Sequence, residues 1–161
     1  MSVRWPRPSF YAVILLVIAL DQLTKAWETA SAGMRERVVP VIPGFFNLVY
    51  GQNTGIAFGM FQGHGLLVGL FIVMLAMVAL YYAKGLNWAS WEPNLVGGCL
   101  CGGALSNLLD RARLGYVVDF LDVYIGTHHW PTFNVADSVI CLAVGWIVLR
   151  QLGIGESKVR S

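Results

Sequence analysis

The chain has 161 residues, a net charge of +2, and a composition that is 57% hydrophobic and only 12% charged. This balance is too apolar for an ordinary soluble domain, and the length suits one compact unit, so we expect a single integral membrane domain over residues 1–161. The small net charge and the lack of any basic run argue against a nucleic-acid-binding protein.

Four apolar segments are long enough, with their flanks, to cross a membrane as helices. They lie at about residues 10–27, 65–83, 95–111 and 133–151. The first follows Arg4 and Arg7, as a signal peptide would, but Asp21–Lys25 is a poor cleavage site, so we interpret it as a retained helix. Four spans place both termini on one side, and a weak excess of lysine and arginine in the inner segments favours the cytoplasm.

The first outer segment, about residues 28–64, contains a strand-like stretch. Residues Arg37–Tyr50 are β-branched and aromatic and are interrupted by proline and glycine, which predicts two or three short strands with turns. A second stretch, Gly115–Phe120, predicts a short strand or a turn that leads back to the membrane. The expected fold is therefore an all-α membrane protein with four transmembrane helices and a small outer β-structured segment.

Small and polar residues share the third span. Gly98 and Gly102 form a Gly-x-x-x-Gly, which predicts close packing against neighbouring helices. Asn107, Asp110 and Arg111 follow at i, i+3 and i+4, so one helix face presents an amide, a carboxylate and a guanidinium that can fork onto a carboxylate. We expect this helix to carry Asn107 into the centre of the molecule.

Cysteine and histidine give no sign of a metal site. Cys99, Cys101 and Cys141 lie in apolar segments and are interpreted as small core residues, and we expect no disulfide. None of the three histidines is spaced as a ligand beside the acidic residues. We therefore expect neither a metal nor another cofactor.

Two aspartates, Asp119 and Asp137, lie near the ends of two predicted spans. A carboxylate at membrane depth is costly and usually functional. Asn134 and Asp137 share a face at the start of the fourth span, where the helix N-terminus favours an anion. Asp122 is a third nearby acid, and spacing does not separate it from Asp119.

Asp21 and Lys25 stand at i, i+4 with the acid first, the favourable order for a helical ion pair. The pair either neutralises two charges at the membrane edge or supports a site. The spacing leaves both interpretations open.

Two carboxylates at close range can share one proton, because both cannot ionise together cheaply. The ionised one can take a proton from water while the other donates to a carbonyl oxygen, which hydrolyses an amide without a metal or a covalent intermediate. The same buried acids would also suit a small transporter or a proton relay.

Five polar blocks occur along the chain in a distinctive order. They are Asp21–Lys25, Asn53–Phe58, Gly103–Arg111, Val117–Phe120 and Phe133–Ser138. In these blocks the chain, from about Tyr11 to Leu152, resembles the bacterial lipoprotein signal peptidases, or type II signal peptidases. Members are four-helix aspartyl proteases of the bacterial cytoplasmic (inner) membrane.

The resemblance implies that Asp119 and Asp137 form a catalytic dyad, which decides against Asp122. It also implies a set of substrate-binding or site-supporting residues. These are Asn53, Gly55, Asn107, Arg111, Asn134, Asp21 and Lys25.

The implied reaction removes the signal peptide of a prolipoprotein just before a cysteine that carries diacylglycerol, near the outer membrane face. The implied outer β-structure, a β-cradle for the substrate, corresponds to Val38–Tyr50. We expect a monomer in contact with membrane lipids, Asp137 as the base, and a loop at Asn53–Phe58 that closes over the peptide with Gly51 and Gly55 as hinges. A protease of unlipidated membrane peptides is the nearest alternative, and a purely structural membrane protein would leave the five blocks unexplained.

Overall fold

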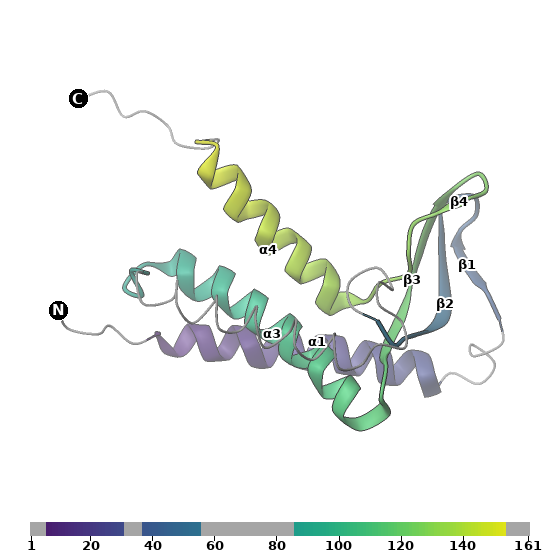
Figure 1. Ribbon diagram of the computed structural model, residues 1–161, viewed down its shortest axis with the longest axis horizontal. Coiled ribbons are helices and arrows are strands. Elements are labelled where there is room, and N and C mark those ends of the chain that lie inside the picture. Colours follow the sequence, from purple (N-terminus) through teal and green to yellow (C-terminus); the bar gives the residue numbers. More distant parts are fainter. Residues whose placement is uncertain (1–5, 31–36, 56–85, 154–161) are drawn as a thin grey trace.

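The computed structural model describes residues 6–30, 37–55 and 86–153. These residues form three helices and a four-stranded sheet that lies at one end of them (Figure 1). The span predicted over residues 65–83 lies outside the described residues. The spans predicted over 10–27, 95–111 and 133–151 correspond to the three helices.

Helix α1 (Pro8–Ala30) is, among the described helices, the one that is long and apolar enough to cross a membrane, with a mean hydropathy of 1.5. Its buried residues are mostly charged: Asp21 and Glu28 are 0% exposed and Lys25 is 3% exposed. Its leucines point outward. This inversion of the soluble pattern is what a lipid environment favours, because the apolar side chains face hydrocarbon while charges pair inside the protein.

Helices α3 (Trp91–Leu114) and α4 (Val135–Gln151) have clear boundaries. α3 ends at Gly115, which adopts a left-handed conformation with φ 82° that a glycine tolerates without steric cost. α4 begins at Asn134, whose side chain caps the helix. α3 extends beyond both ends of the span predicted over 95–111. α4 begins close to the start of the span predicted over 133–151 and ends with it.

Glycines let α3 approach both other helices. A Cβ added at Gly98 would lie 2.8 Å from the Cβ of Val13 in α1, and one at Gly103 would lie 2.7 Å from Cγ1 of Ile140 in α4. No larger residue fits either contact without a shift of the helices. The expected close packing of the third predicted span is confirmed.

The three cysteines do not occupy the core that we expected for them. Cys101 and Cys141 are exposed, and Cys99 is half-buried. The physical reason is that a membrane helix presents apolar residues to lipid, so an apolar neighbourhood in the sequence does not indicate burial inside the protein.

The four strands pair antiparallel in the order β1-β2-β3-β4. They are β1 (Val39–Ile42), β2 (Phe46–Asn53), β3 (Val117–Ile125) and β4 (His128–His129). The strands predicted within residues 37–50 are confirmed as β1 and β2. The molecule is thus not helical throughout, and half of its sheet comes from residues after α3.

Strand β3 is longer than the short strand or turn that we predicted. Its first four residues, Val117–Phe120, are all buried, because β2 pairs beside them and α1 and α3 also contact the strand. Burial on both faces removes the alternation of apolar and polar residues from which a strand is normally recognised. This explains why the sequence pattern indicated only a short element.

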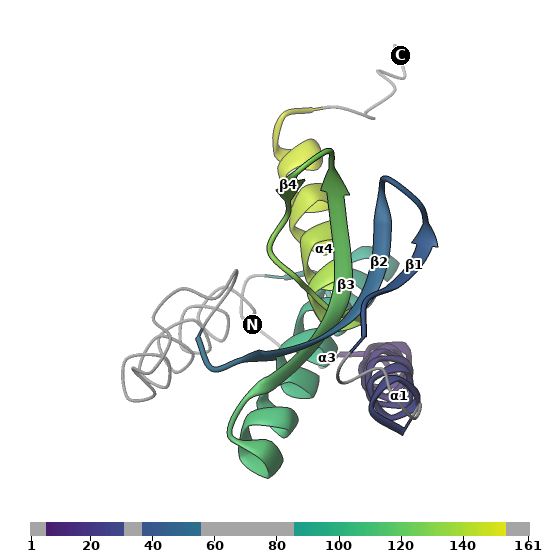
Figure 2. The ribbon, with the colours of Figure 1, turned by 90° about the vertical axis from the view of Figure 1, so that its right-hand side faces the viewer.

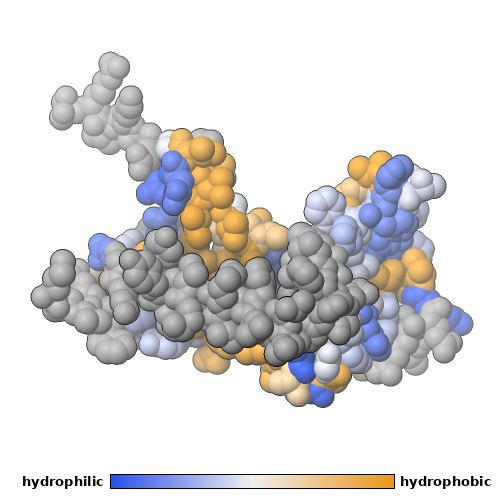
Figure 3. Space-filling model, viewed as in Figure 1, coloured by the Kyte–Doolittle hydropathy of each residue, from blue (hydrophilic) through white to orange (hydrophobic). Residues whose placement is uncertain are grey.

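The sheet and the chain ends of the described helices lie on opposite sides of the molecule. The beginning of α1 and the end of α4 lie on the side away from the sheet (Figure 1), and the sheet stands in front of the helices when viewed from its own end (Figure 2). The visible face of α4 is largely apolar, whereas hydrophilic residues gather near the sheet (Figure 3). The buried polar residues Asp110, Asp119 and Asn134 come from α3, β3 and the start of α4, so the inner polar side chains collect where the helices meet the sheet.

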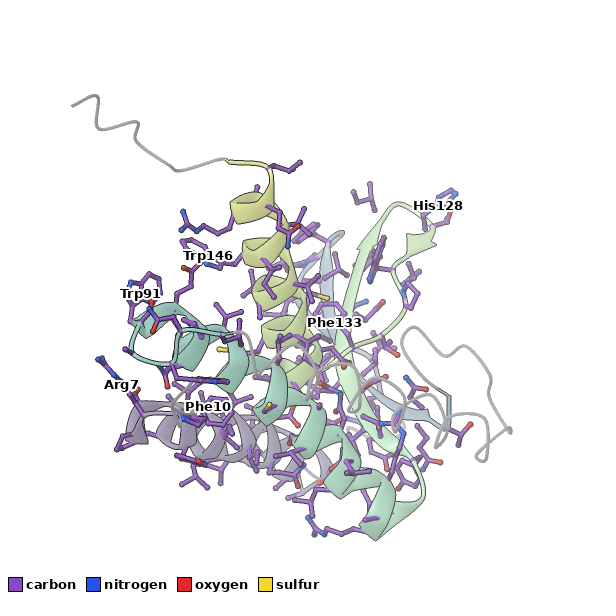
Figure 4. All side chains as sticks on the ribbon, turned by 60° about the vertical axis from the view of Figure 1, so that its left-hand side comes forward. Arg7, Phe10, Trp91, His128, Phe133 and Trp146 are labelled. Atoms are coloured by element: carbon purple, nitrogen blue, oxygen red, sulfur yellow. The ribbon has the colours of Figure 1, made fainter. Side chains whose placement is uncertain are left out.

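A tie at the opposite end joins α3 to α4. Trp146 Nε1 donates to Glu92 Oε1 at 2.7 Å, and Arg150 Nε donates to the same oxygen at 3.1 Å. The rings of Trp91 and Trp146 are 6.1 Å apart. Both tryptophans lie far from His128 at the tip of the sheet (Figure 4). This end gives a reference position for substitutions away from the polar cluster.

Candidate active site

One asparagine joins the two predicted catalytic aspartates. Asn134 Nδ2 donates to Asp119 Oδ1 at 2.8 Å, and the backbone N–H of Asn134 donates to Asp137 Oδ2 at 3.3 Å. Asn134 Oδ1 in turn accepts from the backbone N–H of Asp137 at 2.9 Å. Asp119 comes from β3 and Asp137 from the first turn of α4, so the helix start itself brings the two carboxylates together.

The capping box of α4 explains this local geometry. The N-cap side chain and the carboxylate at the third helical position exchange hydrogen bonds with each other's backbone N–H, which satisfies two donors at the helix start. Asp137 is therefore fixed by its own backbone surroundings. The box uses the amide oxygen of Asn134, so its Nδ2 is left to donate to Asp119 Oδ1 at 2.8 Å and to Asn107 Oδ1 at 3.1 Å.

The end of β2 and the residues just after it support the second carboxylate oxygen of Asp119. Asn53 Nδ2 donates to Asp119 Oδ2 at 3.0 Å, and Asn53 Oδ1 accepts from the backbone N–H of Gly55 at 2.9 Å. Arg111 donates to the carbonyl oxygen of Gly55 at 2.6 Å and to that of Asn107 at 3.3 Å. Among the described contacts, Arg111 thus donates to two backbone carbonyls, and the fork onto a carboxylate that its guanidinium could make is not among them.

Asn107 supports Asp137 from α3. Its Nδ2 donates to Asp137 Oδ1 at 2.8 Å, while its Oδ1 accepts from Lys25 Nζ at 3.0 Å and from Asn134 Nδ2 at 3.1 Å. An ammonium can only donate, so the contact with Lys25 fixes which end of the amide faces Asp137. Asn107 therefore lies in the centre of the cluster, as the sequence predicted.

The Asp21–Lys25 pair predicted from spacing is present and buried. Lys25 Nζ lies 2.7 Å from Asp21 Oδ2 and 2.8 Å from Asp110 Oδ2. Asp21 also accepts from Ser106 Oγ at 2.7 Å and from the backbone N–H of Ala136 at 2.9 Å. The pair therefore connects α1 to α3 and to the first turn of α4, which is more than a neutralised charge at a membrane edge requires.

Sequence reasoning left Asp110 off the list of site residues. Asp110 is 3% exposed and, besides Lys25, accepts from Gln22 Nε2 at 2.8 Å and from the backbone N–H of Val118 at 3.2 Å. It thus ties α1 and α3 to the strand that carries Asp119. A signal was available, because Asp110 shares a helix face with Asn107 at i+3.

The electrostatics separate Asp119 from an ordinary carboxyl. Burial and the neighbouring charge of Asp137 raise the pKa of Asp119 to about 6, although hydrogen bonds from Asn53 and Asn134 and the charge of Lys25 act in the opposite direction. Like charges and desolvation both disfavour the carboxylate form. Near neutral pH this group therefore exchanges a proton readily.

Asp122, the third acid, is held in other contacts. Its carboxylate is buried, but it contacts Asn47 and His129 rather than Asn134. The side chains of Asp119 and Asp122 thus have separate partners. Within residues 6–30, 37–55 and 86–153, no group of three His, Cys, Asp or Glu residues is placed to hold a metal ion.

A family model described as signal peptidase (SPase) II matches residues 13–153, which is most of the chain. The chain belongs to the signal peptidase II family. It is 42% identical over 144 residues to the lipoprotein signal peptidase of Syntrophotalea carbinolica, covering 86% of this chain and 88% of the relative. It is 40% identical over 165 residues to that of Shewanella loihica, covering 98% and 90%.

The solved structures agree with this membership in signal peptidase II. One described as a bacterial membrane enzyme has a TM-score of 0.80 and 27% identity, covering 100% of this chain and 98% of the other. A second has a TM-score of 0.77, also at 27% identity. The chain is thus a membrane-embedded enzyme, an aspartic endopeptidase of the family that removes signal peptides from prolipoproteins, and the resemblance inferred from its five blocks is confirmed.

Proposed function

We propose that the chain removes the signal peptide from diacylglyceryl-modified prolipoproteins by cutting just before the lipidated cysteine, with Asp119 and Asp137 as a catalytic dyad. The observation that carries the proposal is that Asn134 donates hydrogen bonds to both carboxylates, from Nδ2 to Asp119 at 2.8 Å and from its backbone N–H to Asp137 at 3.3 Å. Two carboxylates held to one residue can divide the roles of acid and base.

The environment of each carboxylate suggests its role. The pKa of Asp119 is raised to about 6 by burial and by the charge of Asp137, which favours its neutral, proton-donating form. Asp137 lies in the first turn of α4 and accepts hydrogen bonds from Asn107 and from the backbone of Asn134, which hold its carboxylate in place for proton transfer from water. We assign Asp119 as the acid and Asp137 as the base.

The reaction then needs one water. The water oxygen attacks the scissile carbonyl carbon while Asp137 takes a proton from that water, and Asp119 donates its own proton to the carbonyl oxygen. In the resulting tetrahedral intermediate the C–N bond breaks, the proton on Asp137 passes to the leaving amine, and the hydroxyl proton returns to Asp119 as the carboxyl product forms. Atoms and charges balance, and the dyad ends as it began.

The surrounding residues have positioning roles in this scheme. Asn53 and Asn107 orient the two carboxylates, and Arg111 holds the loop at Gly55 beside Asp119. Lys25 is linked to Asp137 through the amide of Asn107, and it holds Asp21 and Asp110 in the same buried cluster. This cluster fixes α1, α3 and β3 relative to α4.

We further propose a monomer that crosses the bacterial inner membrane four times, with both termini in the cytoplasm and the dyad near the outer face. The outward leucines of α1 and the sheet at one end of three helices support this topology. The second of the four spans, over residues 65–83, falls outside the described residues. The proposed partners are the lipidated prolipoprotein and membrane lipids, with no nucleic acid and no cofactor.

Cleavage of a diacylglyceryl-modified prolipoprotein by the purified protein tests the dyad. We expect Asp119→Asn and Asp137→Asn each to lower kcat by about 100-fold or more, the range of general acid–base effects. Glu92→Gln makes the same change of charge at the far end of the helices and keeps wild-type activity. Retention of normal cleavage by either aspartate variant would refute the dyad, and equal cleavage of an unlipidated substrate would refute the lipid requirement.

A further inference from the structure

Asp122 is a buried carboxylate that the proposed reaction does not use. It is 4% exposed. Its Oδ2 accepts from Asn47 Nδ2 in β2 at 2.8 Å, and its Oδ1 lies 2.7 Å from His129 Nδ1 in β4. A carboxylate can only accept, so Nδ1 of His129 carries the hydrogen. From its place on β3, Asp122 thus holds the strands on both sides.

His129 extends this contact to the neighbouring turn. Its ring stacks on that of Tyr124, with centroids 4.8 Å apart and planes at 9°. The hydroxyl of Tyr124 accepts from the backbone N–H of Gly44 at 2.9 Å, in the turn between β1 and β2. His128, by contrast, points away at the tip (Figure 4). The side chains of Tyr124 and His129 therefore join the hairpin to the rest of the sheet, whereas that of His128 points away from it.

The same hairpin connects the two catalytic aspartates in the sequence. After Asp119 the chain runs up β3, turns into β4 and returns to Asn134 and Asp137. At its base, Phe133 exchanges backbone hydrogen bonds with Leu121 at 2.9 Å and 3.1 Å. Strand β4 has only two residues. Backbone pairing continues from Phe133 through Trp130, whose N–H donates to the Val123 carbonyl oxygen at 2.8 Å, to this short strand, and the Asp122–His129 contact adds a side-chain bond between the same two arms of the hairpin.

We propose that Asp122 and His129 form a hairpin clamp, and that this clamp sets the spacing between Asp119 and Asp137. Both are positioning residues, because they act on the dyad through the backbone of β3 and of residues 130–133. The inference rests on the dyad proposed above. A displacement of a reacting group by about 1 Å can cost up to about 100-fold in rate, so a loosened clamp lowers kcat while substrate binding is retained.

The test measures kcat and KM separately on a lipidated prolipoprotein. His129→Phe keeps a ring to stack on Tyr124 but loses the donor, and we expect about a tenfold loss in kcat with KM within about twofold. His129→Asn restores a donor near the position of Nδ1 and recovers most of the rate. His128→Phe, the matched change at the neighbouring exposed histidine, leaves both constants unchanged. A wild-type kcat for His129→Phe, or a change in KM alone, would overturn the clamp.

A double-mutant cycle shows whether the two residues act together. In an Asp122→Ala background, His129→Phe has little further effect on kcat if the pair is the clamp, whereas independent effects would multiply. Multiplying effects would refute the pairing.

Hydrogen exchange gives a second readout that does not depend on cleavage. We expect His129→Phe to speed exchange at the backbone amides of Leu121 and Trp130 and to leave those of α3 unchanged. Unchanged exchange at both hairpin amides would also refute the clamp. Asp119→Asn and Asp137→Asn are assayed beside these variants: if they still cleave, the dyad fails, and if they are inactive while His129→Phe is normal, the clamp alone fails.

Discussion

At the scale of single residues, Asn134 combines two physical tasks that usually belong to different side chains. Its oxygen caps α4 and its amide nitrogen holds Asp119. Capping is a contribution to stability, and orientation of a carboxylate is a contribution to rate. Since different atoms of the amide perform them, the two contributions can be separated by substitution.

We expect Asn134→Ser to keep the cap, because a serine hydroxyl accepts from a helix N–H, but to lose the donor to Asp119. Its kcat falls by about 100-fold, with the thermal midpoint in detergent close to wild type. Asn134→Ala loses both functions, so that it also loses about 1 kcal/mol of unfolding free energy. A serine variant with normal kcat would contradict the role assigned to the amide.

The pH dependence of kcat/KM follows from the raised pKa of Asp119. If Asp119 acts in its protonated form, kcat/KM falls as pH rises through about 6, the value to which burial and the charge of Asp137 raise this pKa. The apparent value belongs to the coupled dyad. Asn53 donates to the carboxylate, so its removal disfavours the charged form and raises the pKa further.

The pH profile of Asn53→Ala should therefore show its alkaline limb at higher pH than wild type. Asn47→Ala is the matched control on the same strand, because Asn47 bonds to Asp122 and not to Asp119. It can lower the rate but leaves the limb in place. A limb that moves to lower pH in Asn53→Ala would contradict the assignment of Asp119 as the acid.

At the scale of elements, the glycine faces of α3 decide how closely the helices approach. At Gly103 an added Cβ would lie 2.7 Å from Ile140 Cγ1 and 2.9 Å from the carbonyl oxygen of Ala136. Ala136 stands next to Asp137 in the first turn of α4. Crowding here therefore shifts the helix that carries the proposed base.

We expect Gly103→Ala to lower the unfolding free energy by about 1–3 kcal/mol, the usual cost of overpacking, and to lower kcat with it. Gly145→Ala is the control in α4, where an added Cβ meets nothing within 4 Å. Its stability stays at or slightly above wild type because alanine favours a helix more than glycine does. Thermal unfolding in detergent measures both, and equal midpoints would contradict the packing argument.

The sequence predicted correctly those features whose signal lies within a few neighbouring residues. The Asp21–Lys25 pair depends on helical spacing alone, and the strands β1 and β2 depend on residue type and on nearby proline and glycine. Strand β3 could not be predicted at full length, because its pairing with β2 joins residues as far apart as Asn53 and Val117 and its early residues are buried on both sides.

At the scale of the whole molecule, the composition indicated a membrane protein, but a single sequence does not say which charged groups meet inside it. Asp110 was recognised as part of a polar helix face, yet its bonds to Gln22 and to the backbone of Val118 depend on the placement of three elements. The same applies to Arg111, whose partners in the structure are carbonyl oxygens rather than carboxylates. Polar residue types were predictable, and their pairings were not.

The capping box has a consequence for the reaction cycle. If Asp137 is the base, the proton from water arrives on the same carboxylate that accepts from the backbone N–H of Asn134 at 3.3 Å. Protonation removes the negative charge that favours the start of α4, so the first turn is weakest while the tetrahedral intermediate exists. The charge returns when the proton leaves with the amine. Each turnover would then briefly loosen the helix start and tighten it again as the signal peptide departs.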